Sequence, residues 1–185
     1  NVNGTGVFTI TTGTVTKALA KLTTIDVSGM IAMADLTALG LVQSTTNQST
    51  TTLTLNDLVS ETVVLGGAKD TLVLDSTVAN PDTITGFALV AQAANALAAD
   101  AARSDVINVE GATAVTFAKL ISTTSTTYAA ILTEAGASAT ADLVFNFDGD
   151  TYLYSDQGVA GLDDADTLIK LTGTYDLDQL ITVAG

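Results

Sequence analysis

The chain repeats one pattern of polar and apolar positions, in which a turn containing Gly or Asp is followed by apolar residues that alternate with Thr. The clearest copies are residues 62–75, 81–87 and 104–109, and looser copies occupy residues 6–16 and 22–29. Alternation with a period of two predicts a short, half-buried strand, and β-branched residues suit a pleated sheet. The sequence therefore predicts a series of short strands separated by tight turns.

Strands this short cannot bury an apolar face singly, so we expect them to stack on one another. The predicted fold is mainly β, with a Thr-rich parallel β-solenoid, or β-roll, over residues 1–110. The Ala-rich window 88–103 interrupts this pattern and predicts a helical insertion. Its apolar residues recur at helical spacing, at Val90, Ala94, Leu97 and Ala101. A further short helix is predicted over residues 30–41.

Beyond residue 110 the pattern changes, and we expect residues 111–185 to form a small mixed α/β cap. Three strands are predicted at residues 142–147, 151–155 and 167–172, and Asp148-Gly149 between the first two is a typical tight hairpin turn. Short helices are predicted at residues 115–122, 128–135 and 176–180.

Composition narrows the possible functions. The net charge is −14, and 17 of the 20 acidic residues are Asp, which favours turns and calcium loops over exposed helices. Six basic residues form no patch for phosphates, so we do not expect nucleic-acid binding. No apolar run approaches the roughly 18 residues required to cross a bilayer, so we do not expect membrane insertion. The absence of His and Cys removes the usual zinc sites and the Ser-His and Cys-His pairs, so a noncatalytic protein is predicted.

Three other features of the sequence have ordinary structural interpretations. Asp148 and Asp150 flank one glycine at a predicted hairpin tip, which offers no cleft for a pair of catalytic carboxyl groups. The 33 Thr residues favour solvated β faces over a glycosylated or ice-binding surface, because their spacing is irregular. Tyr152 and Tyr154 are expected to pack in the core rather than bind a sugar.

An Asp at the start of successive stacked strands predicts a column of carboxylates that needs cations. The expected cofactor is Ca²⁺, which takes six to eight oxygen ligands. In the loop 156–166, an EF-hand is not supported, and a less regular calcium loop and a solvated acidic loop both stay open. The candidate metal ligands are Asp70, Asp75, Asp82 and Asp105 in the solenoid and Asp150, Asp156, Asp163, Asp164 and Asp166 in the cap.

The segment Gly66-Gly67-Ala68-Lys69-Asp70-Thr71-Leu72 resembles the nonapeptide of the repeats-in-toxin family of secreted, calcium-binding bacterial proteins. It keeps the Gly pair, the Asp and the Leu, but it is one residue short and has Lys69 where the family has Gly or Asn. Residues 145–154, together with residues 166–173, resemble the C-terminal module of proteins exported by type I secretion. That resemblance implies a secretion-signal-like tail.

These resemblances imply the C-terminal region of an extracellular, type I secreted surface-layer protein at the bacterial cell surface. We expect calcium-dependent self-assembly into a homo-oligomer or lattice, and contact with cell-surface polysaccharide through a region that this sequence lacks. Two alternatives stay open. The chain could be the calcium-binding secretion tail of an exported hydrolase, or an adhesin domain.

Overall fold

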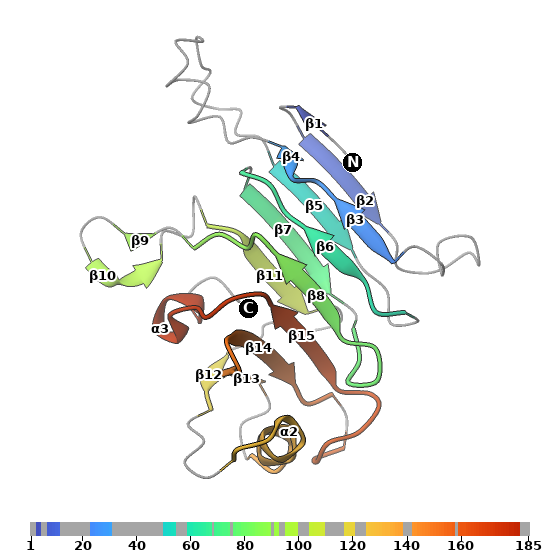
Figure 1. Cartoon of the computed structure of the whole chain (residues 1–185), viewed down its shortest axis with the longest axis vertical. Coiled ribbons are helices and arrows are strands. Elements are labelled where there is room, and N and C mark those ends of the chain that lie inside the picture. Colours follow the sequence, from blue (N-terminus) through green and yellow to red (C-terminus); the bar gives the residue numbers. More distant parts are fainter. Residues whose placement is uncertain are drawn as a thin grey trace.

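The fold is mainly strands arranged in two larger sheets, with two described helices near the C-terminus (Figure 1). The computed structural model describes residues 3–4, 7–11, 23–30, 50–54, 59–67, 69–74, 76–89, 91–92, 95–99, 104–109, 117–120, 125–138, 142–157 and 159–181.

One sheet has four strands, all parallel, in the order β11-β7-β5-β2. Its strands are β2 (Val7–Thr11), β5 (Thr50–Thr54), β7 (Lys69–Leu74) and β11 (Val106–Val109). The register aligns Leu53, Leu72 and Ile107 in one row across the sheet, and all three side chains are fully buried.

The other sheet has seven strands and is mixed, in the order β12-β13-β14-β15-β8-β6-β3. The strands β3 (Thr24–Asp26), β6 (Thr62–Val64) and β8 (Asp82–Thr85) are parallel to one another and to β15 (Thr167–Leu171). The strands β13 (Asp142–Phe147) and β14 (Asp150–Ser155) pair antiparallel with each other, and β14 pairs antiparallel with β15.

Successive strands of the first half alternate between the two sheets. In chain order, β2, β5, β7 and β11 lie in the four-stranded sheet, and β3, β6 and β8 lie between them in the seven-stranded sheet. Within each sheet, strands that follow one another in this order are hydrogen-bonded neighbours. The predicted parallel pairing of short strands is therefore confirmed for both sheets. A short parallel pair, β1 (Asn3–Gly4) and β4 (Gly29–Met30), accompanies them.

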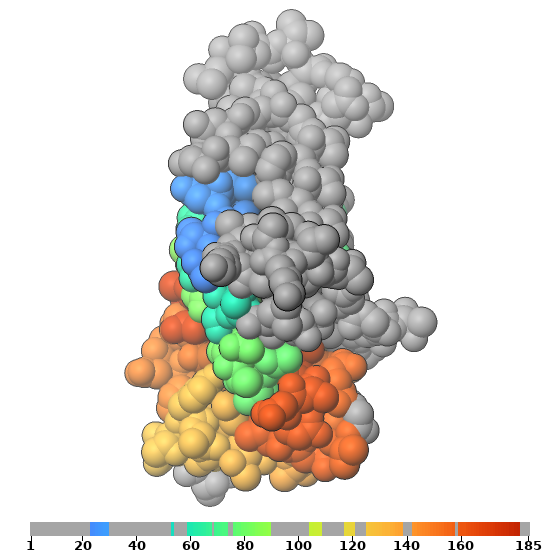
Figure 2. Space-filling view, turned by 90° about the vertical axis from the view of Figure 1, so that its right-hand side faces the viewer, coloured from blue at the N-terminus to red at the C-terminus, as the bar shows by residue number. Residues whose placement is uncertain are grey.

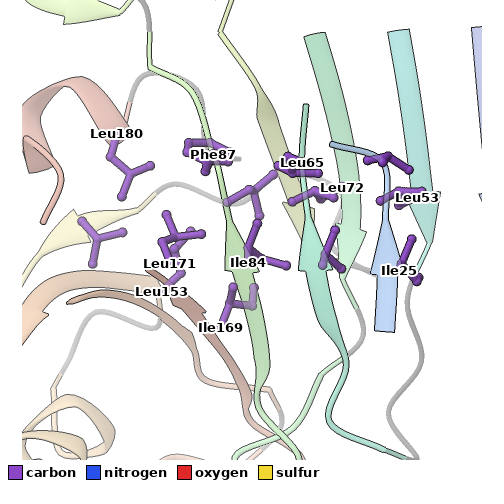
Figure 3. Close-up of a cluster of buried hydrophobic side chains, with 14 of the residues drawn as sticks. Ile25, Leu53, Leu65, Leu72, Ile84, Phe87, Leu153, Ile169, Leu171 and Leu180 are labelled. Carbon is purple, nitrogen blue, oxygen red and sulfur yellow. The ribbon is translucent and has the colours of Figure 1, made fainter. Parts of the chain in front are cut away.

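The main core lies between the inner faces of the two sheets (Figure 3). Alternation in each strand sends one set of side chains inward, so Ile25, Val63 and Ile84 form a buried row opposite the row in the four-stranded sheet. On the outer face, Thr24 and Thr62 are exposed, which agrees with the predicted solvated Thr surface.

The same core continues into the C-terminal half. Leu153, Ile169 and Leu171 belong to the cluster that contains Ile84 and Phe87. Because β15 pairs with β8, the segments on either side of the predicted boundary at residue 110 share one sheet and one core. Figure 2 shows β3 (blue) toward one end of the described surface and the C-terminal part (orange to red) at the other.

A second core lies between α2 (Tyr128–Gly136) and the other face of β13, β14 and β15. Because β14 is covered on both faces, residues 151–155 are all buried. Gly136 packs so closely on the loop after β14 that an added Cβ would lie 2.5 Å from the Leu162 nitrogen. The side chains of this core are Ile131, Leu132, Ala135, Leu143, Phe145, Tyr152, Tyr154 and Leu168.

Several C-terminal predictions are confirmed. The helix predicted at residues 128–135 is α2, and the turn predicted at 176–180 contains α3 (Leu177–Leu180). The three predicted strands are β13, β14 and β15. The hairpin turn between the first two places Asp148 at φ 49° and Gly149 at φ 85°, the pair of positive angles that a type I′ turn requires.

The helix predicted over residues 88–103 is wrong for the residues that the structure describes. These residues contain β9 (Ala91–Gln92) and β10 (Asn95–Ala99), which pair antiparallel. Ala88 is held extended, because its N–H donates to Asp105 and its carbonyl accepts from the Asp105 N–H. The high helix propensity of Ala is outweighed by these tertiary bonds.

The helix predicted over residues 115–122 is also wrong where it is described. Residues 117–120 contain β12 (Ala118–Lys119), which pairs parallel with β13, and Phe117 is buried in the main core. Of the helix predicted over residues 30–41, Met30 belongs to β4 and the rest lies outside the described residues.

The end of β8 at Gly86 lies close to the end of β6 at Leu65. This contact predicts the effect of replacing Gly86. Gly86 has φ +83°, and a Cβ there would lie 2.9 Å from the Leu65 carbonyl oxygen. Gly86→Ala should therefore lower the free energy of unfolding by more than the roughly 1–2 kcal/mol that a left-handed angle costs an L-residue. Gly149→Ala is the matched control, because Gly149 has φ +85° and nothing within 4 Å. Equal losses in urea unfolding would contradict the close contact.

Candidate functional site: buried carboxyl groups and the acidic loop

Two carboxyl groups are buried side by side at the starts of β7 and β11. Asp70 and Asp105 are both fully buried. The Asp105 Oδ1 accepts from the Asp70 N–H at 2.8 Å, and its Oδ2 accepts from the Ala88 N–H at 2.7 Å. Asp105 therefore joins two neighbouring strands of one sheet to the chain that leaves the other sheet after β8.

A second pair lies at the starts of β6 and β8 in the other sheet. Glu61 and Asp82 are 1% and 0% exposed, and the Asp82 Oδ1 accepts from the Glu61 N–H at 2.9 Å. The predicted stacking of carboxyl groups is thus present, but as two separate pairs. Glu61 was not predicted. Glu61 lies just before β6, which pairs with β8. This position at the start of a strand is the feature that could have identified it.

Burial raises the pKa of the Asp105 carboxyl from its ordinary 3.8 to about 7. The nearby Asp70 adds to this rise, whereas the main-chain hydrogen bonds and the charge of Lys69 oppose it. Desolvation dominates because a charged carboxylate loses its hydration when it is enclosed by the sheet. The site therefore holds a proton readily near neutral pH.

Asp166 organises the loop 156–166. Its side chain is fully buried and accepts three hydrogen bonds. The donors are the Tyr154 hydroxyl at 2.7 Å, the Asp163 N–H at 2.8 Å and the Gln157 N–H at 3.1 Å. Burial, and then the bond to Asp166, raise the pKa of Tyr154. The Asp166 side chain therefore holds the two ends of its own loop together through hydrogen bonds.

The other candidate ligands are dispersed. The Asp150 Oδ2 lies 2.6 Å from the Lys170 Nζ, and this ion pair lowers the pKa of Asp150. Asp164 is exposed, while Asp156 and Asp163 are partly exposed. The Asp163 Oδ1 accepts from the Ala165 N–H. Asp75 lies outside the described residues.

The described residues do not fit a calcium site built from several carboxylates. No three acidic side chains come together in a group suited to a metal ion within the described ranges. The oxygens of Asp105 and Asp166 already accept main-chain N–H groups, whereas Ca²⁺ needs six to eight oxygens directed at one point. A calcium requirement stays a prediction.

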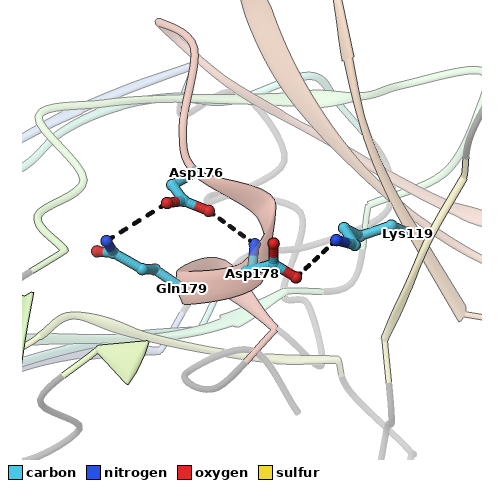
Figure 4. Close-up of polar contacts among 4 residues, drawn as sticks. All are labelled: Lys119, Asp176, Asp178 and Gln179. Atoms are coloured by element: carbon cyan, nitrogen blue, oxygen red, sulfur yellow. Dashed lines mark hydrogen bonds and ion pairs between the residues drawn. The ribbon is translucent and has the colours of Figure 1, made fainter. Parts of the chain in front are cut away.

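A polar clamp closes the C-terminal end of the main core (Figure 4). Asp176 caps α3 by accepting from the Asp178 N–H, and Asp178 pairs with Lys119 at 2.6 Å. The clamp holds the buried Leu180 against the core. The Tyr175 hydroxyl donates to the Phe87 carbonyl at 2.8 Å, which ties the same segment to the end of β8.

Tyr152 and Tyr154 pack in the core, as the sequence predicted. Tyr152 and Tyr154 are 8% and 0% exposed, so neither offers a flat face to a ligand. Tyr152 stacks on Phe145 with ring centroids 5.4 Å apart and meets Tyr128 of α2 at 5.2 Å.

Comparison of the sequence with models of known families and with curated proteins gave no match. Within the described part of the chain, neither helix has the length and apolar character needed to span a membrane.

The raised pKa of Asp105 predicts a pH-dependent stability. Between about 4 and 7 the native state binds more protons than the unfolded state, so this group's contribution to stability should fall as pH rises through that window. The slope can reach about 1.4 kcal/mol per pH unit. Asp105→Asn should reduce the slope of the free energy of unfolding against pH, measured in urea titrations from pH 4 to 8. Asp164→Asn, at an exposed loop position, should not. An unchanged slope in Asp105→Asn would contradict the assignment.

The hydrogen bond between Tyr154 and Asp166 predicts a local effect. Tyr154→Phe keeps the ring but removes one donor to a buried carboxylate, which should cost about 1–3 kcal/mol. Hydrogen exchange should accelerate at the Gln157 and Asp163 amides. Tyr152→Phe is the control, since the Tyr152 hydroxyl has no hydrogen bond among the described residues. Equal exchange in both variants would count against Asp166 as the centre of the loop.

Proposed function

We propose that the chain is a noncatalytic structural protein of the bacterial cell surface, which is exported by type I secretion and assembles into a layer. Its fold is a two-sheet parallel β-solenoid closed at its C-terminal end by the antiparallel strands β13 and β14 and by α3. The observation that supports this proposal is the alternation of successive strands between the two sheets. Stacked units of this kind present repetitive surfaces suited to lattices.

The two ends of the solenoid differ. At the C-terminal end, β8 is covered by β15, and Leu180 fills the core. At the other end, β2 and β3 are the edge strands of their sheets in the described part of the chain. An edge strand directs a row of main-chain N–H and C=O groups outward and can pair with another chain. These two edge strands support the proposed assembly through this end.

The hydrogen bonds of β3 show which residues direct their main chain outward. The Thr23 carbonyl accepts from the Thr62 N–H, and the Val27 N–H donates to the Val64 carbonyl. Alternation then turns the N–H of Thr24 away from β6. Thr24→Pro should remove an outward donor and leave the bonds to β6 in place.

We expect the wild-type protein to form ordered assemblies visible by electron microscopy and light scattering, and Thr24→Pro to reduce them. Thr24→Val, a good strand former, is the matched control. Circular dichroism checks that each variant is folded. A wild-type protein that stays monomeric at high concentration, with millimolar calcium present, would refute the assembly function.

The same experiment tests calcium. Assembly is compared in samples that contain Ca²⁺, Mg²⁺ or chelator. Both cations screen negative charge, but Mg²⁺ demands a stricter octahedral shell, so the comparison separates a specific calcium site from general screening. Assembly and melting temperature that respond to Ca²⁺ alone support the calcium-dependent layer. Equal behaviour in all three samples would show that the acidic turns need no bound calcium.

A further inference from the structure

The hairpin tip between β13 and β14 contains the one Asp-Gly step of the sequence. Of the 17 Asp residues, Asp148 alone is followed by Gly, and both Asp148 and Gly149 are exposed. The peptide nitrogen that follows an Asp can attack the carboxyl carbon of that Asp and close a five-membered succinimide ring. Because Gly has no side chain, nothing on Gly149 itself hinders this attack.

The surroundings of the tip also leave room for the reaction. A Cβ built on Gly149 would meet no heavy atom within 4 Å, so no other part of the chain crowds this side of the peptide bond. Asp148, at φ 49°, is the one non-glycine residue with a positive φ in the described part of the chain. A left-handed angle is unfavourable for an L-residue, so rotation away from the turn geometry relieves strain at Asp148.

The Asp148 carboxyl group is free to approach its own following nitrogen. It has no hydrogen bond and no ion pair among the residues that the structure describes. Asp150, by contrast, accepts from the Gly173 N–H and pairs with Lys170, and Asp166 accepts three hydrogen bonds. Carboxyl groups that are bound in this way are held by their partners.

The movement that the reaction needs is local. The Asp148–Gly149 peptide must rotate out of the hairpin geometry, so that its nitrogen faces the carboxyl carbon. Phe147 and Asp150 form the last pair of the ladder between β13 and β14, so only the two tip residues have to move. Openings of exposed segments with few buried contacts cost far less free energy than global unfolding. The folded protein can therefore reach the reactive geometry.

We propose that the Asp148–Gly149 bond is a self-modification site, at which the folded protein converts Asp148 to isoaspartate. The Gly149 nitrogen bonds to the Asp148 Cγ, the C–OH bond of the protonated carboxyl group breaks, and the hydroxyl leaves as water with the proton of the nitrogen. A second water then opens the ring. Addition at the main-chain carbonyl carbon leaves the chain running through Cγ, whereas addition at Cγ restores Asp148. Water is the only reactant, and no electrons are gained or lost.

The product changes the hairpin. Isoaspartate adds one methylene group to the main chain of a two-residue turn, whose length sets the pairing of Phe147 with Asp150. Asp150 also holds the Gly173 N–H and Lys170 of β15, so a displaced Asp150 weakens both contacts. The modification therefore loosens this corner of the C-terminal half as the protein ages.

Peptide mapping of the ageing protein tests the proposal. The full chain is incubated at neutral pH and physiological temperature, and samples are taken over weeks. Electron-transfer fragmentation in a mass spectrometer then measures the isoaspartate fraction at each Asp. Conversion should be several-fold faster at Asp148 than at Asp164, which is also exposed but is followed by Ala165. Equal rates at these two positions would overturn the proposal.

Two variants and one unfolded sample complete the experiment. Gly149→Asn keeps a residue that tolerates a positive φ but places a side chain beside the nitrogen, so conversion should slow several-fold. Asp148→Asn should convert faster, because ammonia leaves in place of water, and its product gains a carboxyl group. Wild-type protein unfolded in guanidinium chloride should convert at a rate comparable with the folded protein. Conversion confined to the unfolded sample would show that the turn protects the bond, and would refute the proposal.

Discussion

The fold depends on carboxyl groups that accept main-chain N–H groups where strands begin. Where the chain passes from one sheet to the other, peptide groups lie outside the regular ladders, and buried donors must be paired. Asp82 accepts from the residue before the neighbouring strand, and Asp105 accepts from two segments at once. These bonds fix the register of adjacent coils, and the register aligns the buried rows of aliphatic side chains. A slip of one residue would turn each row toward solvent.

This arrangement has an electrostatic cost that the rest of the molecule offsets. Four buried carboxyl groups, in pairs on neighbouring strands, cannot all be charged without repulsion, which is consistent with the raised pKa of Asp105. Apolar burial between the sheets compensates for the desolvation. The short Asp side chain reaches a main-chain N–H at the corner with little loss of rotamer freedom, which explains the excess of Asp over Glu at these positions.

The periodicity of apolar residues predicted individual strands correctly where the pattern lies within the strand itself. The period of two in residues 62–87 and the Asp-Gly turn at 148–149 identified strands and a hairpin, and Gly136 lies close to the end of the predicted helix. The helices predicted at 88–103 and 115–122 failed for one reason. Ala88 and Leu120 are held by main-chain bonds to Asp105 and Val144, which are distant in sequence and invisible to propensity. The sequence likewise singled out Asp82, Asp105 and Asp166 but not their roles as hydrogen-bond acceptors, which depend on contacts between segments distant in sequence.

The two ends of this fold differ in strand direction and charge, and the difference bears on the proposed assembly. At one end, β15 and β14 extend the seven-stranded sheet beyond β8 and reverse direction, and α3 lies against the core, while β11 is the edge strand of the four-stranded sheet among the described residues. Most of the acidic residues lie toward this end, and contact between two such ends would bring two strongly negative surfaces together. In the proposed assembly, contact between unlike ends would avoid that repulsion, so the charge of the described residues favours a directional array over a symmetric pair.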